Sequence, residues 1–244
     1  MATNLYKRDL PNDLDLGPIV AIDTETMGLN PNRDRLCVVQ LSSGDGNAHI
    51  IQIEKDQKTA PNLCKLLENH SVIKLFHFGR FDIAVLLKKF NVLTSPVYCT
   101  KIASKLVRTY TDKHGLKNLI NELLELDISK QQQSSYWGSK ELTTDQINYA
   151  ASDVLHLHKI KTILDVRLKT EGRVEIAKKY WLFGVSIMTS IFLTSLFIMS
   201  FPKSIISVTI GFAMISFSQP FIQSACNVLP PTVEFLSSEE NRQF

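Results

Sequence analysis

The sequence predicts an α/β protein in which a mixed five-stranded sheet is flanked by helices and is followed by a hydrophobic helical tail. Three apolar runs in quick succession, separated by turn residues, predict an antiparallel beginning of the sheet. Strand-like and helix-like segments then alternate, which is typical of parallel strands joined by helices. The third observation is that residues 180–233 contain a single charged side chain, Lys203.

The first three predicted strands are joined by short connections. Residues 18–24 (PIVAIDT) read as a buried strand whose apolar run stops at Asp23. Residues 36–42 (LCVVQLS) and 48–53 (AHIIQI) are the next two strands. The segment SGDGN between them has the glycine, asparagine and aspartate that hairpin turns favour, so we expect an antiparallel meander.

The spacing of apolar residues becomes helical after this meander. Residues 61–69 begin with a proline, which favours the first turn of a helix. Strands are predicted at 72–78 and 96–100, and helices at 82–90, 100–110 and 116–126. A long amphipathic helix is predicted over 143–169, with Thr143, Thr144 and Asp145 as capping candidates.

Composition bounds the class of protein. The chain has 244 residues and 44% hydrophobic residues, which is enough for a packed core and excludes a disordered chain. A net charge of +3 is only a weak indication of a polyanionic partner. The cysteines are scattered without a C-x-x-C pair, which favours a reducing compartment: Cys37, Cys64, Cys99 and Cys226.

Acidic residues occur in three places that suit metal chemistry. Asp23 and Glu25 are two residues apart at the end of a strand, so their side chains share one face. Their charges repel unless a cation lies between them. Asp82 begins a predicted helix, and Asp153 follows Tyr149 by four residues, which places a phenol and a carboxylate on one helical face.

Each of these residues also has a purely structural interpretation. Asp23 and Glu25 could form an exposed acidic turn, and Asp82 could cap a helix. Asp153 alone reads as a solvated helix residue and Tyr149 alone as a core residue. Only their occurrence together, in this order, favours an active site.

Three motifs carry a resemblance to a known family. The segments DTETMGL, HFGRFDIAVL and YAASDVLHL resemble the three exonuclease motifs of the DEDD superfamily, and the Tyr149-x-x-x-Asp153 spacing matches its tyrosine branch. The chain is most similar to ribonuclease D, in particular to short bacterial ribonuclease D-like proteins. This resemblance covers residues 1–179.

The resemblance implies a ribonuclease H-like fold and two divalent cations, Mg²⁺ or Mn²⁺. Asp23, Glu25 and Asp153 would bind the first ion. Asp23 would bridge to the second, which Asp82 would hold largely through water. Tyr149 would orient the attacking water, and the product would be a nucleoside 5′-monophosphate released from a 3′ end.

The resemblance also implies substrate contacts. The expected residues are Thr24, Met27, Gly28, Leu29 and His77, although Met27 and Leu29 could instead pack locally. Phe78 departs from the family, because many members carry an asparagine there that contacts the sugar. Tyr136 stands where an acidic residue is expected. These departures concern substrate selectivity and leave the metal ligands unaffected.

The function implied by the motifs is 3'-5' exonuclease activity on single-stranded RNA, in RNA processing or turnover. The same fold could act on DNA 3′ ends, since two-metal chemistry does not need the 2′-hydroxyl. A different alternative is a membrane-tethered nucleic-acid-binding module without catalysis. No obligate protein partner is expected.

The hydrophobic composition of the C-terminal segment predicts that it attaches the protein to a membrane. Residues 181–201 form an uncharged run long enough to cross a bilayer, and residues 205–225 form a weaker second run. Positive charges precede the first run, so the nuclease domain is expected on the cytoplasmic face of the membrane: Lys169, Arg173, Lys178 and Lys179. Buried C-terminal helices, a fusion or a shifted reading frame are the alternatives. The expected division is 1–179, 180–226 and a polar 227–244.

Overall fold

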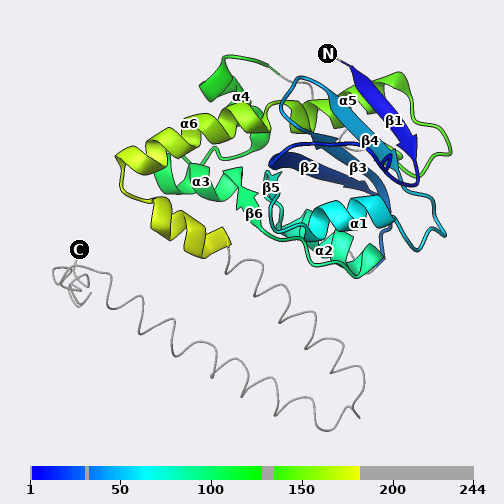
Figure 1. The fold of residues 1–244 in the computed structure, drawn as a ribbon. Coiled ribbons are helices and arrows are strands. Elements are labelled where there is room, and N and C mark those ends of the chain that lie inside the picture. The colour runs from blue at the N-terminus through cyan, green and yellow to red at the C-terminus, as the bar shows by residue number, and fades with distance from the viewer. Residues whose placement is uncertain (1, 31–32, 128–134, 182–244) are drawn as a thin grey trace, which may run out of the picture. The chain divides into compact units, whose positions relative to one another are not determined.

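A computed structural model describes residues 2–30, 33–127 and 135–181, which form a mixed sheet with helices on both faces (Figure 1). The strands are β1 (Thr3–Lys7), β2 (Ile19–Thr26), β3 (Leu36–Ser42), β4 (Ala48–Gln52), β5 (Ile73–Phe76) and β6 (Val97–Cys99). The helices are α1 (Pro61–Glu68), α2 (Arg80–Phe90), α3 (Thr100–Val107), α4 (Leu116–Leu124), α5 (Thr144–Leu155) and α6 (Leu157–Thr170).

The strand order is β1-β4-β3-β2-β5-β6. The antiparallel meander of β2, β3 and β4 is confirmed, and β5 and β6 continue the sheet in parallel with β2. The expected number of five strands is wrong, because the described part of the chain has a sixth, β1, which pairs in parallel with β4. Its sequence, TNLYK, has no apolar run, so its extended conformation depends on pairing with a distant strand.

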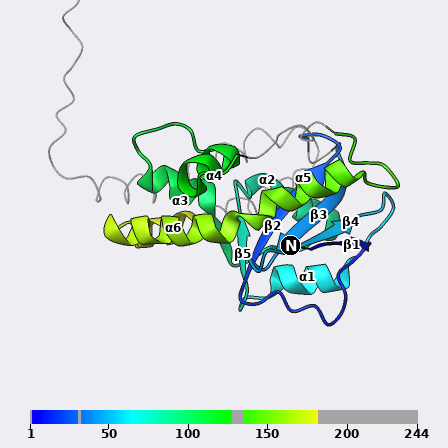
Figure 2. The same ribbon diagram turned by 90° about the horizontal axis from the view of Figure 1, so that it is seen from above.

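The alternation along β2 assigns its side chains to two different cores. Val20 and Ile22 pack in the core that includes residues of α1 and α2, whereas Ala21 packs in the core that includes residues of α5 and α6. Figure 2 shows α1 and α5 on opposite sides of the sheet. Because side chains alternate, Asp23 and Glu25 share the face of Ala21, and Thr24 shares the face of Ile22.

The single helix expected over 143–169 is wrong, because the helix is interrupted at His156. The first part, α5, lies across β2, β3 and β4, and the second part, α6, packs against α3 and α4 (Figure 1). His158 Nε2 lies 3.0 Å from the carbonyl oxygen of Ile19, which ties the start of α6 to the sheet. Neither proline nor glycine marks this break, so it follows from tertiary packing.

A capping box fixes the beginning of α5. The Thr143 hydroxyl accepts a hydrogen bond from the backbone N–H of Gln146, and the Gln146 side chain accepts one from the backbone N–H of Thr143. The predicted capping by Thr143 is therefore confirmed. Since the cap sets where α5 begins, it also sets which residues of the helix face the sheet.

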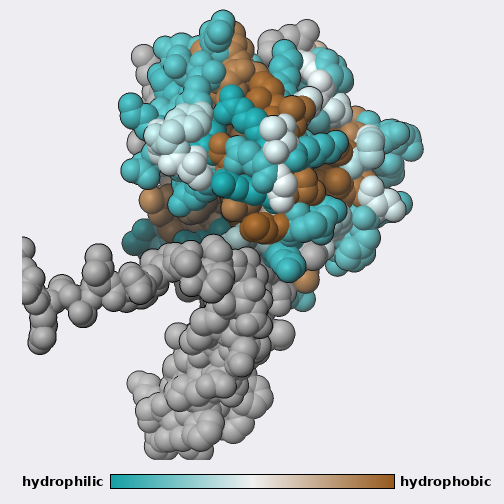
Figure 3. Space-filling model, turned by 90° about the vertical axis from the view of Figure 1, so that its left-hand side faces the viewer, coloured by the Kyte–Doolittle hydropathy of each residue, from teal (hydrophilic) through white to brown (hydrophobic). Residues whose placement is uncertain are grey.

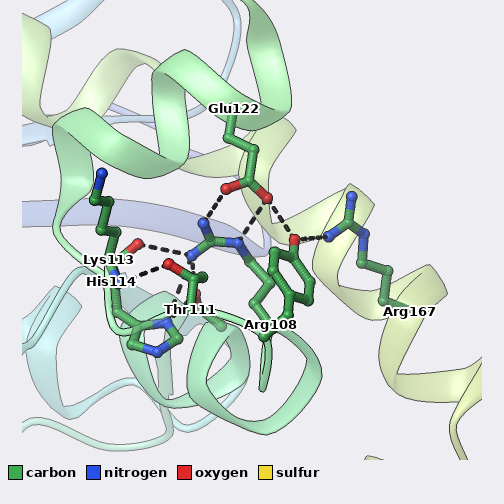
Figure 4. A network of polar contacts seen from close by, with 8 residues as sticks. Arg108, Thr111, Lys113, His114, Glu122 and Arg167 are labelled. Atoms are coloured by element: carbon green, nitrogen blue, oxygen red, sulfur yellow. Dashed lines mark hydrogen bonds and ion pairs between the residues drawn. The ribbon is translucent and has the colours of Figure 1, made fainter.

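A buried arginine organises the connection between α3 and α4 (Figure 4). The Arg108 side chain is fully buried and donates to both carboxylate oxygens of Glu122. It also donates to the Ser104 hydroxyl and to the Lys113 carbonyl oxygen, each at 2.9 Å. A guanidinium buried without such acceptors would be strongly unfavourable, so these contacts define the path of the loop.

The predicted hydrophobic segments lie almost wholly outside the described residues. Within the described ranges, the structure contains no helix whose length and hydropathy would let it cross a bilayer. Residues 182–244 are not described, so the hairpin and the three-part division stay predictions.

On the face of the described domain in Figure 3, apolar side chains gather in bands between polar ones. Exposed apolar side chains near the end of the described chain are Val166, Ile176 and Tyr180.

Candidate active site

Three carboxylates meet beside the carboxyl-terminal half of β2. Asp23 and Glu25 come from that strand, and Asp153 comes from α5, which covers the same face of the sheet. One oxygen from each carboxylate lies within 4.8 Å of the others. The structure therefore brings together the residues expected to bind the first cation, and Asp153 is not merely a solvated helix residue.

The fourth acidic residue, Asp82, approaches from α2. It is only 5% exposed, and its Oδ1 accepts a hydrogen bond of 2.6 Å from the Thr24 hydroxyl. The helix is capped by Gly79, so the interpretation of Asp82 as the N-cap is wrong and the residue lies in the first turn. A side chain on Gly79 would overlap the Phe76 side chain, and glycine thus lets α2 begin close to β5.

The carboxylates perturb one another strongly. Burial, followed by the charges of Asp153 and Asp82, raises the pKa of Glu25 to about 9. Burial and the other three carboxylates raise the pKa of Asp23 well above its ordinary range. Burial raises the pKa of Asp82 to about 6 although the Thr24 hydroxyl lowers it. Among the causes of these shifts there is no cationic side chain of the described residues, so the carboxylates hold protons that a bound cation would displace.

This donor set fits divalent cations. It consists of carboxylate oxygens, which are the ligands that Mg²⁺ and Mn²⁺ prefer. A divalent cation would supply the positive charge that the surrounding described side chains do not provide. The geometry supports Asp23, Glu25 and Asp153 as one ligand group, with Asp82 close enough to interact with Asp23 electrostatically.

Tyr149 lies beside this cluster on α5. Its hydroxyl forms a hydrogen bond with Asp153, and its ring packs near Trp137 with centroids 6.1 Å apart. Burial and the neighbouring carboxylates raise the pKa of the phenol. The residue therefore combines the two interpretations that the sequence left open, because the ring is packed while the hydroxyl reaches the site.

Sequence analysis missed Gln40, which contacts the cluster directly. Gln40 lies opposite Asp23 in the antiparallel pair and its Nε2 donates to Asp23 Oδ2 at 2.9 Å. The side chain is fully buried. The available signal was a glutamine inside an otherwise apolar strand, which needs a buried polar partner. The structure identifies that partner as the central carboxylate.

The residues expected to touch substrate occupy different environments. Met27 and Leu29 follow β2 and are 38% and 86% exposed, so both are available to a ligand. A side chain on Gly28 would overlap the Asp34 carboxylate, so Gly28 permits this close approach. Met27 Sδ also lies close to Gly138, next to the exposed Tyr136. Leu29 is thus not packed locally.

Thr24 and His77 have internal partners. The Thr24 side chain is buried and its hydroxyl donates to Asp82, so the side chain supports Asp82, and the expected substrate contact of Thr24 stays a prediction. The reason for the contact with Asp82 is the strand alternation, which turns Thr24 toward α2. His77 Nδ1 lies 2.9 Å from Thr100 Oγ1, and burial together with Lys101 lowers the pKa of His77 to about 3. His77 is therefore neutral.

A cluster of carboxylates at the end of a mixed sheet, with a tyrosine on the facing helix, is the arrangement of the exonuclease class that the sequence motifs resemble. The family model described as 3'-5' exonuclease matches residues 6–169. The chain belongs to this 3'-5' exonuclease family, and its similarity to ribonuclease D is confirmed by curated relatives of that name.

The relatives include proteins of known structure. Ribonuclease D of Granulibacter bethesdensis is 37% identical over 157 residues, which are 64% of this chain and 39% of that protein. NrnC of Brucella melitensis with bound Mg²⁺ is 52% identical with a TM-score of 0.76, over 79% of this chain and 94% of NrnC. Ribonuclease D of Escherichia coli is 25% identical with a TM-score of 0.63, over 70% of this chain and 45% of that protein.

The chain thus spans about two fifths of the length of the curated ribonuclease D relatives it matches. A second structure of NrnC, 53% identical to this chain, contains bound pGG. The Escherichia coli protein is described as an exoribonuclease involved in structured RNA processing.

Proposed function

We propose that this protein is a metal-dependent 3'-5' exonuclease that removes nucleoside 5′-monophosphates from the 3′ end of RNA. The observation that supports this function best is the meeting of Asp23, Glu25 and Asp153 within 4.8 Å, beside Asp82 and Tyr149. Family membership and the ribonuclease D relatives support the choice of RNA.

Four carboxylates would serve as the metal ligands in this proposal. Asp23, Glu25 and Asp153 would hold one Mg²⁺ or Mn²⁺, and Asp23 with Asp82 would hold a second. Bound cations stabilise negative charge on the attacking and leaving oxygens of an in-line displacement at phosphorus. Gln40 fixes the orientation of Asp23 through its hydrogen bond, and Thr24 does the same for Asp82.

Tyr149 positions the nucleophile in this proposal. Burial and the neighbouring carboxylates raise the pKa of the phenol, so the hydroxyl is better suited to orienting a water molecule than to acting as a free base. It can hold a water molecule by hydrogen bonding, since it lies beside Asp153 at the edge of the carboxylate cluster. Met27 and Leu29, which are exposed beside the end of β2, would contact the terminal nucleotides.

The test of this function compares RNA and DNA of equal length, labelled at the 5′ end, with Mg²⁺, with Mn²⁺ and with EDTA. We expect progressive shortening of RNA from the 3′ end and release of mononucleotides only with a divalent cation. A 3′-phosphate should block the reaction, and a circular RNA should stay intact. Absence of metal-dependent degradation of either polymer would refute the enzyme and favour a binding module, whereas preferential degradation of DNA would favour the DNA alternative.

Very short RNA is a second candidate substrate. The observation that favours it is the structure of NrnC bound to pGG, because NrnC is 53% identical to this chain in that comparison. We infer that pGG competes with longer RNA for the carboxylate site. Steady-state kinetics with pGG and with a longer RNA of the same 3′ sequence will give kcat/KM for each. A higher kcat/KM for the longer RNA would contradict a preference for very short substrates.

A further inference from the structure

An exposed aromatic residue lies in the connection between β5 and α2, four residues before Asp82. Phe78 is 46% exposed, whereas its neighbour Phe76 in β5 is fully buried. Exposing a phenylalanine ring to water forgoes the burial that stabilises most aromatic side chains. The fold therefore presents Phe78 at the surface at an energetic cost, and neither of the two apolar cores includes it.

The backbone at Phe78 has an uncommon conformation. Its φ angle is +64°, in the left-handed region that residues with a side chain rarely adopt. The residue after it, Gly79, begins α2 at close approach to Phe76. This tight connection between β5 and α2 directs the Phe78 side chain outward while the preceding His77 contacts Thr100.

Two cationic side chains surround the ring. The Lys101 ammonium lies 3.8 Å from the ring centroid, and the Arg80 guanidinium carbon lies 5.8 Å from it. Arg80 is the first residue of α2, two residues after Phe78, and Lys101 is the second residue of α3, so two segments of the chain converge here. An exposed ring with cations over it suits single-stranded nucleic acid, since a base can take the place of a cation on the ring while the cation moves to a phosphate.

The connection that carries Phe78 starts at the same edge of the sheet as the carboxylate cluster. In the parallel pair of β2 and β5, Ala21 lies opposite Leu75, so the chain reaches Asp23 and His77 at the same edge of the sheet. Phe78 follows His77 directly, and Asp82 is in the first turn of the helix that Arg80 begins. Phe78 is therefore placed where it can meet an RNA whose 3′ end reaches the carboxylates.

We propose that Phe78, Arg80 and Lys101 form an RNA-binding surface in which the Phe78 ring stacks on one of the two 3′-terminal bases and the cations contact the adjoining phosphates. This inference rests on the proposed function, and it assigns a stacking contact where the family commonly has an asparagine that contacts the sugar. The ligand is the 3′ end of single-stranded RNA.

The stacking contact is tested by binding to a protein that leaves RNA intact. In an Asp23→Asn background, Phe78→Ala should weaken the binding of fluorescently labelled RNA about tenfold, which is typical for loss of one base–aromatic stack. Phe78→Trp should restore it. The matched control is Val166→Ala, which removes apolar surface at a 60% exposed position on α6 and should leave affinity unchanged. Thermal unfolding of each variant checks that the fold is retained.

A modified substrate separates stacking from a merely structural role. RNA lacking the base at either of the two 3′-terminal positions should bind more weakly, and at one of them the effect of Phe78→Ala should disappear. Equal weakening of intact and abasic RNAs by Phe78→Ala would overturn the stacking contact, as would unchanged affinity for intact RNA.

The phosphate contacts have their own signature. Arg80→Ala and Lys101→Ala should each reduce the slope of log affinity against log salt by about one. Lys88→Ala removes an exposed charge at the far end of α2 and should leave the slope unchanged. Equal effects of all three substitutions would mean that RNA is attracted by the overall positive charge alone, and would overturn the proposal that Arg80 and Lys101 contact specific phosphates.

The binding measurements also distinguish this inference from the proposed function. If the wild-type protein degrades no RNA but Phe78 still governs binding, the exonuclease function fails and the RNA-binding surface stands. If the wild-type protein degrades RNA and Phe78→Ala changes neither the affinity nor KM, the function stands and the surface is wrong.

Discussion

Successive residues of β2 serve the site on opposite faces of the sheet, because side chains alternate along a strand. Asp23 and Glu25 face α5 and its Asp153, whereas Thr24 faces α2 and hydrogen-bonds to Asp82. One strand thus supports carboxylates that arrive from both sides of the sheet. A shift of the strand by one residue would exchange these faces and separate the whole cluster.

The first prediction concerns the central carboxylate and the phenol. Asp23→Asn should lower kcat on RNA on the order of a thousandfold, because stabilisation by bound cations is worth several kcal/mol. Tyr149→Phe should lower it only about ten- to a hundredfold, since the carboxylates remain and only the water is less well held. Single-turnover kinetics will measure both values. Asp145→Asn, in the first turn of the same helix as Tyr149, is the control and should retain full activity.

The second prediction links pH, cations and stability. The pKa of Glu25 is raised to about 9 from an ordinary 4.5, so the folded protein holds a proton that the unfolded chain releases across that range. Stability without divalent cations should therefore fall as pH rises from about 5 to 9, by at most about 1.4 kcal/mol per pH unit for this proton. Urea unfolding with EDTA at several pH values will measure the slope.

Two comparisons make this pH prediction specific. Adding Mg²⁺ or Mn²⁺ should restore stability above neutral pH, because cations bind the ionised carboxylates. Glu25→Gln removes the titrating group and should flatten the dependence. A stability that rises between pH 5 and 9 in EDTA would contradict the charge balance described for the cluster.

The site residues differ in how visible they are from sequence. Asp23, Glu25, Asp82, Tyr149 and Asp153 stand out together, because their order and spacing match the three motifs, although each residue alone has a structural interpretation. Gln40 does not, because its partner is known only once β2 and β3 are paired. The role of Thr24 likewise depends on α2 reaching the opposite face of the sheet.

At the scale of elements, the loop between α3 and α4 depends on one buried ion pair. Arg108 binds Glu122, and the hydroxyl of Tyr110 joins the same carboxylate to Arg167 of α6 (Figure 4). Three helices therefore share a single polar network. Because Arg108 is completely buried, its charge needs a partner, whereas an exposed charge would be solvated.

The third prediction follows from this burial. Glu122→Gln should destabilise the protein by about 2 kcal/mol, because it leaves a buried guanidinium without a charged partner. Glu54→Gln breaks the exposed pair with Arg8 and should cost less than about 1 kcal/mol. Chemical denaturation of both variants will give the difference. Equal effects would mean that Arg108 is stabilised by its neutral acceptors alone.

The elements that sequence analysis predicted incorrectly share a physical cause. The strand β1 and the break at His156 both depend on contacts with distant segments, and neither is marked by apolar periodicity, proline or glycine. The strands and helices that were predicted correctly are those with a strong apolar pattern, such as β3 and β4. Local apolar patterns predict which residues are buried. The strand β1 and the break at His156 depend instead on tertiary contacts, which local patterns do not reveal.

At the scale of the whole molecule, the described domain has its own core, and the last of the described carboxylates that form the cluster is Asp153. The described chain continues with Ala177, which is fully buried, and Trp181, whose ring lies 4.2 Å from that of Tyr98. These contacts extend the packing of the described domain to Trp181, so a truncation that preserves them should end after Trp181, and the boundary at 179 stays a prediction.

The fourth prediction concerns the hydrophobic C-terminal segment. We propose that residues 181–225 attach the nuclease domain to the cytoplasmic face of a membrane, because each buried Leu, Ile, Phe or Val favours insertion by roughly 0.3 to 0.6 kcal/mol. The full-length protein should sediment with membranes and resist high-salt extraction, whereas residues 1–181 should stay in the supernatant and degrade RNA. A full-length protein that runs as a monomer without detergent would contradict membrane attachment.

The interruption of the helix at His156 has a mechanical consequence. A pull on the chain beyond Trp181 enters the domain through the stack on Tyr98 and through the hydrogen bond from Arg173 to the Leu106 carbonyl, which lead to β6 and α3. A continuous helix would transmit such tension as a rod to Asp153. Because α5 and α6 are separate helices, a displacement of α6 need not move Asp153, which α5 holds against β2, β3 and β4.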